Sequence, residues 1–254
     1  MGLPTLKEYL ANWTLEGRTR GQVADTVSAL ADASVRLSEI IGRGSLDNRL
    51  GRVVARTGDF DEQKEIDVLA NGIIVDALRD APVAALASEE AAMPISLTKD
   101  APLLVATDPL DGSSNVDANV SVGTIFSVLP RHPSSEGEAA FLRPGAHQLA
   151  AGFFVYGPQT VLALTVGHGT QIFTLDRAHG VYHLTTRNVA IPTEANEYAI
   201  NGSNARHWDE PIRIYIHDCE NGENGPRGHD FNMRWTGSPV ADVFRILTRG
   251  GIYL

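Results

Sequence analysis

Two aspartates stand three positions apart in the stretch TDPLDGSSN, residues 107–115, which follows an apolar run. A reverse turn needs one aspartate, and the Asp-Gly pair at the centre already supplies it. The other carboxylate, Asp108, therefore needs a different explanation. Divalent cations such as Mg²⁺ prefer oxygen ligands and are commonly bound by a few carboxylates together with substrate phosphate. A tight turn at the intervening Pro-Leu pair would let Asp108, Asp111 and a backbone carbonyl face one such ion.

The residues that follow this pair are suited to an anion. Gly112, Ser113 and Ser114 offer consecutive backbone N–H groups and two hydroxyls, which is the chemistry of an anion-binding nest. A cation on one side and a nest on the other predict a phosphate site.

Two further acidic clusters lie beside predicted element ends. Asp61 and Asp67 occur in DEQKEID, and Glu89-Glu90 directly follows the run VAALAS. Loops at element ends are where active sites are usually built. The alternative is structural, because Asp-Pro-x-Asp-Gly is good turn sequence and acidic pairs are common on solvated loops. The local pattern leaves both readings open.

Several classes of function are disfavoured. The chain has no Gly-x-Ser-x-Gly, Walker or His-Glu-x-x-His motif, and its histidines lack ligand spacing. A net charge of −10 argues against a nucleic-acid partner. The single cysteine, Cys219, excludes an intrachain disulfide and indicates a reducing compartment. Without an apolar run of about 18 residues or a signal sequence, we expect a cytoplasmic protein with no membrane partner.

The elements that must position these residues follow from periodicity. Apolar side chains at helical spacing predict helices over 20–41, 62–80, 208–217 and 238–249, the last with Ser238 as its N-cap. Short β-branched runs between them predict strands: VAALA, LLVAT, VSVGTIFSV, AGFFVYG, TVLALTV and TQIFTLD. Hairpins are expected across Gly157-Pro158 and across 167–169. This order predicts a layered α+β protein with a second sheet beginning near Tyr198.

These residues together resemble the class I fructose-1,6-bisphosphatases. The resemblance rests on SEE, on TDPLDGSSNVDANVSVGTIF at 107–126, on DEQKEIDVLAN, and on LRPG, LAAGFFVYGPQTVLALTVG, RWTGSPVADVFRIL and GGIYL in the same order. The shorter Asp-Pro-Leu-Asp-Gly-Ser core is shared with the wider lithium-sensitive, magnesium-dependent phosphatases, which include the inositol monophosphatases.

The resemblance implies a role for each acidic cluster. Asp67 and Glu90 match the pair that orients and deprotonates the attacking water, and Asp61 matches a mobile-loop acid that completes the site. The implied metal ligands are Glu89, Glu90, Asp108, Asp111 and the Leu110 carbonyl. The implied ions are two or three Mg²⁺, with Mn²⁺ or Zn²⁺ as substitutes.

Both phosphates of a sugar bisphosphate have implied partners. The departing 1-phosphate would lie against Asp111 and Gly112-Ser113-Ser114. Asn201 matches the asparagine that holds the 6-phosphate, Arg234 the arginine that reaches it from a neighbouring subunit, and Trp235 stands where the family usually has a tyrosine.

The family also implies a layered α/β/α/β/α fold and an activity. We expect an N-terminal subdomain over 1–195 with the metal-binding motifs, and part of a C-terminal substrate-binding subdomain over 196–254. The implied enzyme is a homotetrameric hydrolase that converts fructose 1,6-bisphosphate to fructose 6-phosphate, in gluconeogenesis or the Calvin cycle, with sedoheptulose 1,7-bisphosphate as a further substrate. The alternatives are another lithium-sensitive phosphatase and a catalytically impaired phosphate-binding protein.

The chain departs from the family pattern in two ways. A tyrosine, a lysine and a metal-binding glutamate are expected beyond Leu254, so we expect a C-terminally truncated chain that turns over poorly. The positions at which animal and many bacterial relatives bind AMP read Arg20-Gly21-Gln22, Pro102-Leu103 and Leu129-Pro130. Because the side chains of Pro and Leu cannot hydrogen-bond a phosphate, AMP is a doubtful effector.

Overall fold

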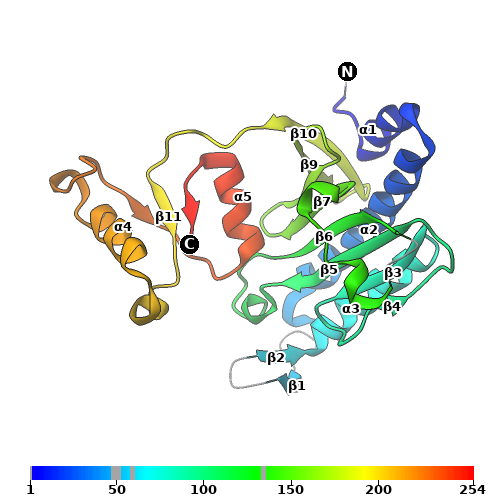
Figure 1. Cartoon of the computed structure of the whole chain (residues 1–254), viewed down its shortest axis with the longest axis horizontal. Helices are drawn as coiled ribbons and strands as arrows, with labels where there is room; N and C mark the ends of the chain where they lie inside the picture. Colours follow the sequence, from blue (N-terminus) through cyan, green and yellow to red (C-terminus); the bar gives the residue numbers. More distant parts are fainter. Residues whose placement is uncertain (1, 47–52, 58–60, 133–135) are drawn as a thin grey trace.

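A computed structural model describes residues 2–46, 53–57, 61–132 and 136–254. Its centre is an eight-stranded sheet in the order β10-β9-β8-β7-β6-β5-β3-β4 (Figure 1). The strands are β3 (Val83–Ser88), β4 (Ile95–Ser96), β5 (Leu103–Asp111), β6 (Val122–Pro130), β7 (Ala150–Tyr156), β8 (Thr160–Thr165), β9 (Thr170–Asp176) and β10 (Val181–Val189). Neighbours pair antiparallel, except β3 and β5, which run parallel. All six predicted strands and both predicted hairpins are confirmed.

Two helices cover one face of this sheet. They are α2 (Arg18–Arg43) and α3 (Glu65–Arg79), and α1 (Leu6–Trp13) packs against α2 and β10. The predicted apolar faces are buried, with Leu30 on α2 and Ile74 on α3 fully inaccessible. The prediction of a helix from 62 is wrong at its start, because Asp61–Lys64 form β2, which pairs with β1 (Val53–Thr57). Within the described ranges no helix is long and apolar enough to cross a bilayer.

The opposite face carries α5 (Pro239–Arg249), which also contacts a second, smaller sheet. That sheet has the order β12-β11-β13, all parallel, from β11 (Glu197–Ala199), β12 (Asn232–Met233) and β13 (Ile252–Tyr253). Helix α4 (Glu210–Glu220) packs on it through Ile216 and Cys219. The layers are therefore helices, large sheet, α5, small sheet and α4 (Figure 1), which confirms the predicted α+β layering and the second sheet near Tyr198.

Candidate active site

Both aspartates of the opening motif lie inside β5, which continues through Asp-Pro-Leu-Asp. Asp108 and Asp111 have two residues between them, whereas their partners in β6 have one, so the motif is a β-bulge. The expected tight turn is wrong. Pro109 has no N–H for the ladder, and the Leu110 N–H donates to Asp108 Oδ1 at 3.0 Å.

Two buried hydroxyl groups, those of Thr124 and Tyr156, support this bulge from the neighbouring strands. The single β6 residue opposite the bulge is Thr124, whose Oγ1 donates to the Pro109 carbonyl at 2.8 Å and lies 2.9 Å from the Tyr156 hydroxyl. Thr124 is fully inaccessible and Tyr156 is buried, and burial raises the pKa of the Tyr156 phenol well above its ordinary value. The bulge is thus held by the core of the sheet.

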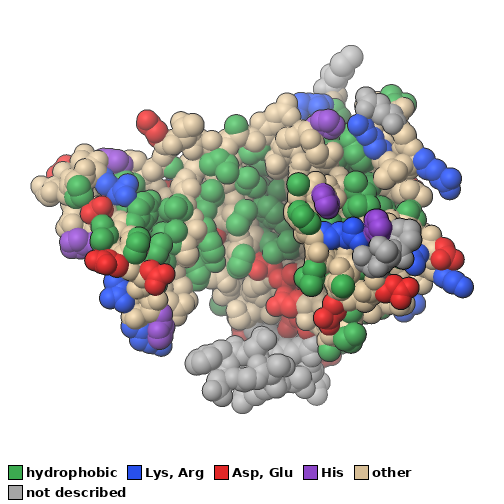
Figure 2. Space-filling model, in the orientation of Figure 1, with side chains coloured by type: hydrophobic (Ala, Val, Ile, Leu, Met, Phe, Trp, Pro, Cys, Tyr) green, Lys and Arg blue, Asp and Glu red, His purple; other side chains and the backbone are tan. Residues whose placement is uncertain are grey.

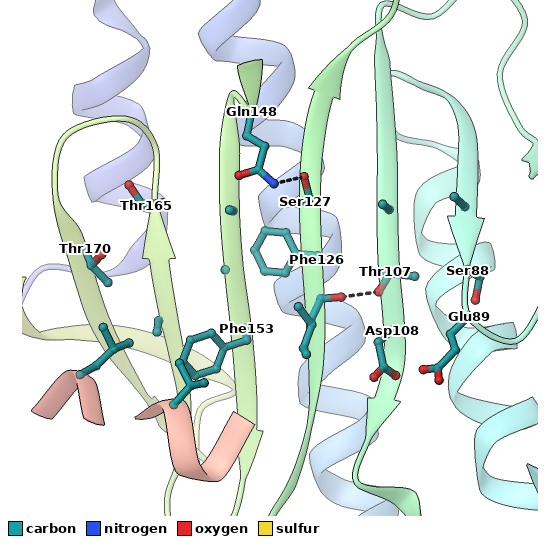
Figure 3. Close-up of a pocket in the computed structure, with 18 residues that line it drawn as sticks. Ser88, Glu89, Thr107, Asp108, Phe126, Ser127, Gln148, Phe153, Thr165 and Thr170 are labelled. Atoms are coloured by element: carbon teal, nitrogen blue, oxygen red, sulfur yellow. Dashed lines mark hydrogen bonds between the residues drawn. The ribbon is translucent and has the colours of Figure 1, made fainter. Parts of the chain in front are cut away.

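The parallel pairing of β3 with β5 brings Glu89 beside Asp108. Ser88 pairs with Thr107, and the Glu89 N–H donates to the Thr107 carbonyl at 3.1 Å. The two carboxylates consequently lie next to each other, Glu89 just after the end of β3 and Asp108 inside β5 (Figure 3). Burial, the charges of Glu89 and Asp111 and a hydrogen bond with Glu89 raise the pKa of Asp108 to about 8. The site therefore favours a bound positive charge.

Asp111 faces the other way, toward the start of α5. Its Oδ2 accepts from the Ser238 hydroxyl at 3.1 Å and from the Val240 N–H at 3.0 Å. Ser238 stands at the predicted N-cap position, but its side chain makes no capping bond, because Asp111 accepts the helix N–H in its place. Burial raises the pKa of Asp111, and these two hydrogen bonds partly offset the rise.

The glycine after Asp111, Gly112, lies at the same contact between the end of β5 and the start of α5. Gly112 has φ +75° and precedes a short 3₁₀ turn, η3 (Ser113–Asn115). A Cβ on Gly112 would lie 3.0 Å from the Ser238 side chain. Both the left-handed backbone and the close approach of α5 therefore require glycine here, and they place Ser113 and Ser114 beside the acidic residues.

Helix α3 brings the predicted water-activating acid to the same edge. Asp67 is buried in its first turn, at 2 % exposure. One turn later Asn71 accepts from the Ser88 hydroxyl at 2.8 Å, and that hydroxyl accepts from the Glu90 N–H at 3.3 Å. Asp67 shares the face of Asn71, so it lies on the side of α3 that meets the end of β3. The side chain of Asp61 lies outside the described residues.

The predicted partners of the far phosphate gather at the small sheet. Asn201 follows β11, and Arg234 and Trp235 follow β12, at the carboxyl ends of parallel strands. Asn201 accepts from the Ser203 N–H at 3.0 Å, and the Arg234 N–H donates to the Tyr198 carbonyl at 2.8 Å. The Trp235 ring stacks on Tyr253 of β13, with centroids 5.5 Å apart.

The segment 236–240 joins these two groups. Asn115 Nδ2 donates to the Gly237 carbonyl at 3.1 Å, next to the contacts that Asp111 makes with α5. Burial first, and then the charges of Asp242 and Asp111, raise the pKa of Tyr253, so this ring is within electrostatic range of the acidic group. The segment after Asp111 is thus tied by a hydrogen bond to the segment that follows Arg234 and Trp235.

The donor set fits a divalent cation only in part. Among the side chains that the structure describes, no three from His, Cys, Asp and Glu lie together as a complete metal-binding group. Glu89 and Asp108 are adjacent, whereas Asp111 uses one oxygen on α5. The crowding of carboxylates that raises the pKa of Asp108 is nevertheless the environment that a cation would relieve. The assignment of Glu89, Glu90, Asp108, Leu110 and Asp111 as ligands stays a prediction.

A cleft of about 640 Å³ opens from the Glu89–Asp108 pair across the face of the large sheet. Small and apolar side chains line most of it, including Phe153 from β7 and Val243 and Leu247 from α5 (Figure 3). Acidic side chains gather on the same face of the molecule, near the middle of Figure 2. The acidic end of the cleft therefore offers partners to a cation, and the apolar walls offer none.

Sequence reasoning missed the residues that support the site. Asn115, Thr124 and Tyr156 lie within the motifs quoted above, but nothing in those motifs indicates their supporting contacts, and Ser238 was expected to cap its own helix. Asp111 and Val240 are 129 positions apart, so no local pattern pairs them. Covariation between such positions is the signal that would have found them.

Two protein-family models together match nearly the whole chain. Residues 4–187 match the model described as fructose-1-6-bisphosphatase, N-terminal domain, and residues 191–254 match the model of its C-terminal domain.

Similar curated proteins and a similar solved structure bear the same family name. The class 1 fructose-1,6-bisphosphatase 2 of Xanthobacter autotrophicus is 50 % identical over 99 % of this chain and 78 % of its own length. That of Nitrobacter vulgaris is 56 % identical over 92 % of this chain and 68 % of its own length. The holo Leishmania major fructose-1,6-bisphosphatase superposes with a TM-score of 0.89 at 29 % identity, covering 100 % of this chain and 78 % of that one. The chain belongs to the fructose-1,6-bisphosphatase family.

Proposed function

We propose that this protein is a metal-dependent phosphatase that hydrolyses the 1-phosphate of fructose 1,6-bisphosphate. The observation that carries the proposal is the pair of adjacent carboxylates of Glu89 and Asp108, with Asp111 and Gly112-Ser113-Ser114 next along the chain. Burial of Asp108 and the charges of Glu89 and Asp111 raise the pKa of Asp108 to about 8. Family membership and the names of the relatives support the reaction.

Each residue of the acidic end has a proposed task. Glu89, Glu90, Asp108, Asp111 and the Leu110 carbonyl would hold the cations, which when bound supply the charge that activates water and neutralises phosphate oxygens. Asp67 and Glu90 orient the attacking water and accept its proton, and Asp61 completes the site. Gly112, Ser113 and Ser114 hold the departing phosphate.

The far end binds the phosphate that is not cleaved. Asn201 and Trp235 lie against the 6-phosphate, and Arg234 reaches it from a neighbouring subunit. The exposure of the Arg234 side chain, 47 %, leaves its guanidinium accessible to a partner chain. Binding of a phosphate that does not react supplies energy to place the one that does.

The finer features remain proposals. We propose Mg²⁺ as the physiological ion, with Mn²⁺ or Zn²⁺ as substitutes, a homotetramer, and a cytoplasmic role in gluconeogenesis or the Calvin cycle. We also propose a division into subdomains 1–195 and 196–254. Sedoheptulose 1,7-bisphosphate is a further candidate substrate, because its two phosphates are also at the ends of a sugar chain.

Release of inorganic phosphate tests the reaction. With Mg²⁺ we expect release from fructose 1,6-bisphosphate, none without divalent ions, and little from myo-inositol 1-phosphate. Asp67→Asn should lower kcat by about 10²–10⁴-fold, the range for loss of a general base, and exposed Asp25→Asn should not. Preference for the inositol ester would support the wider phosphatase class, and bisphosphate binding without release would support an impaired binding protein.

We further propose that AMP does not inhibit the enzyme. Leu103 and Leu129, which occupy two of the positions where AMP-sensitive relatives bind the nucleotide, are buried at 1 % and 5 % exposure, so neither presents a polar group to a phosphate. Phosphate release should be unchanged by AMP at millimolar concentration. Half-inhibition in the low micromolar range would contradict this.

A further inference from the structure

Three arginines converge on one carboxylate at the small sheet. Glu197 Oε1 accepts from Arg234 Nε at 2.7 Å and from Arg249 Nη2 at 2.6 Å, and Oε2 accepts from Arg245 Nη1 at 2.9 Å. The Glu197 residue is 9 % exposed. Burial alone would raise the pKa of Glu197, but the hydrogen bonds from Arg245 and Arg234 outweigh it and hold that pKa below its ordinary value.

The three arginines differ in how exposed they are and in how many of their N–H groups remain available to another ligand. Arg245 is partly buried, with 13 % of its side chain exposed. Its Nη2 also lies 3.4 Å from Asp242 Oδ1 and from the Arg234 carbonyl. Arg234 and Arg249 are exposed to 47 % and 58 %. Arg234 uses its Nε on Glu197, and none of the described residues accepts a hydrogen bond from its two Nη groups. One edge of this guanidinium is fixed, and the other is available to an anion.

The backbone beside Arg234 is also held. The Thr236 N–H and Oγ1 donate to Asp242 Oδ2 at 3.2 and 2.8 Å, and Asp242 is fully inaccessible. The stretch from Arg234 to Thr236 is therefore attached to β11 at one end and to α5 at the other. A free arginine side chain loses rotamer entropy on binding, and a side chain that is already ordered loses less.

We propose that Glu197 is a positioning residue for the 6-phosphate subsite: it holds the Arg234 guanidinium in the orientation in which its Nη groups meet the phosphate. This inference rests on the proposed function, because it assumes that Arg234 binds the far phosphate. A purely electrostatic role predicts the opposite effect. Glu197 is the negative charge nearest to three positive ones, so removing it would strengthen anion binding if charge alone mattered.

Steady-state kinetics of Glu197→Gln in the full chain separates the two. We expect KM for fructose 1,6-bisphosphate to rise about tenfold, the loss of one charge-assisted contact, with kcat within about twofold. Fructose 1-phosphate, which lacks the far phosphate, should be hydrolysed with unchanged kcat/KM. Glu194→Gln, an exposed glutamate three positions earlier, is the matched control.

A double-mutant cycle with Arg234→Ala provides the second readout. If Glu197 acts through Arg234, Glu197→Gln should add no further rise in KM to the Arg234→Ala enzyme. A lower KM, additive effects, or an equal loss on fructose 1-phosphate would each overturn the proposal.

Further measurements are needed if the Glu197→Gln variant does not fold or if the wild-type chain is inactive. If Glu197→Gln does not fold, as judged by its thermal transition, Glu197→Asp keeps the charge and shortens the side chain, and it should raise KM in the same substrate-dependent way. If the wild-type chain releases no phosphate from the bisphosphate, the proposed function fails. Calorimetric binding of fructose 6-phosphate then tests the positioning: weaker binding by Glu197→Gln supports it, and equal or tighter binding overturns it.

Discussion

Asp108 contributes to the way in which the stability of the metal-free protein depends on pH. Its folded pKa of about 8 lies above the ordinary value of 3.8, so ionisation favours the unfolded chain. The contribution of this group is complete below pH 4 and is lost as the pH rises toward 8. Asp108→Asn should therefore stabilise the metal-free protein at pH 8 by about 1–2 kcal/mol, since solvent discounts the full shift, and should change nothing at pH 4.

Urea unfolding at the two pH values measures this effect. The control Asp25→Asn, at an exposed aspartate, should leave the free energy of unfolding unchanged at both pH values. Mg²⁺ should restore the stability that the wild-type protein loses at pH 8, and it should not change the stability of Asp108→Asn. An Asp108→Asn protein that is less stable at pH 8 would contradict the prediction.

Substitution of Thr124 tests whether its hydroxyl stabilises the β-bulge at Pro109. Thr124→Val keeps the side-chain shape but removes the hydroxyl that donates to the Pro109 carbonyl and meets Tyr156. Two buried polar groups then lose their partner, and we expect a loss of about 1–3 kcal/mol in the free energy of unfolding. Tyr156→Phe leaves the Pro109 bond in place and should cost less. Equal losses for the two variants would show that the carbonyl bond contributes little.

At the scale of elements, α5 and β5 meet at Gly112. Gly112→Ala places a Cβ 3.0 Å from Ser238 at φ +75°, and the backbone alone should cost about 1–2 kcal/mol. Adding Ser238→Gly removes the contact but not the backbone strain, so the double variant should recover part of the loss. Gly145→Ala, where nothing lies within 4 Å of the added atom, is the control. Thermal unfolding measures all three, and a Gly112→Ala protein as stable as wild type would refute the argument.

The elements were more predictable than their junctions. Strands β5 to β9 and helices α2 and α5 follow from local periodicity, which depends on neighbouring residues alone. The bulge at Pro109 depends on register with β6, and the capping of α5 by Asp111 joins residues 129 positions apart. The convergence of three arginines on Glu197 likewise spans 37 to 52 positions. Such contacts depend on the packed fold, so the sequence predicts candidate residues for the chemistry but not the contacts that hold them in place.

At the scale of the whole molecule, α5 is shared by the two sheets. It packs on β6 and β7 through Val240 and Phe244, and Arg245 ties it to β11 through Glu197. We therefore expect both sheets to unfold in one transition, although the sequence suggests a division near residue 195. Urea curves followed by circular dichroism and by tryptophan fluorescence should coincide. Two separated transitions would show that the layers are independent.

The stacking of Trp235 on Tyr253 gives the protein an optical reporter at the end of the site where no bond is broken. The indole follows Arg234 directly and lies on a segment anchored to α5, so a phosphate that arrives there changes the field around the ring. With Trp13 and Trp208 replaced by phenylalanine, emission belongs to this ring alone. Stopped-flow mixing would then time the docking of the far phosphate separately from hydrolysis of the near one.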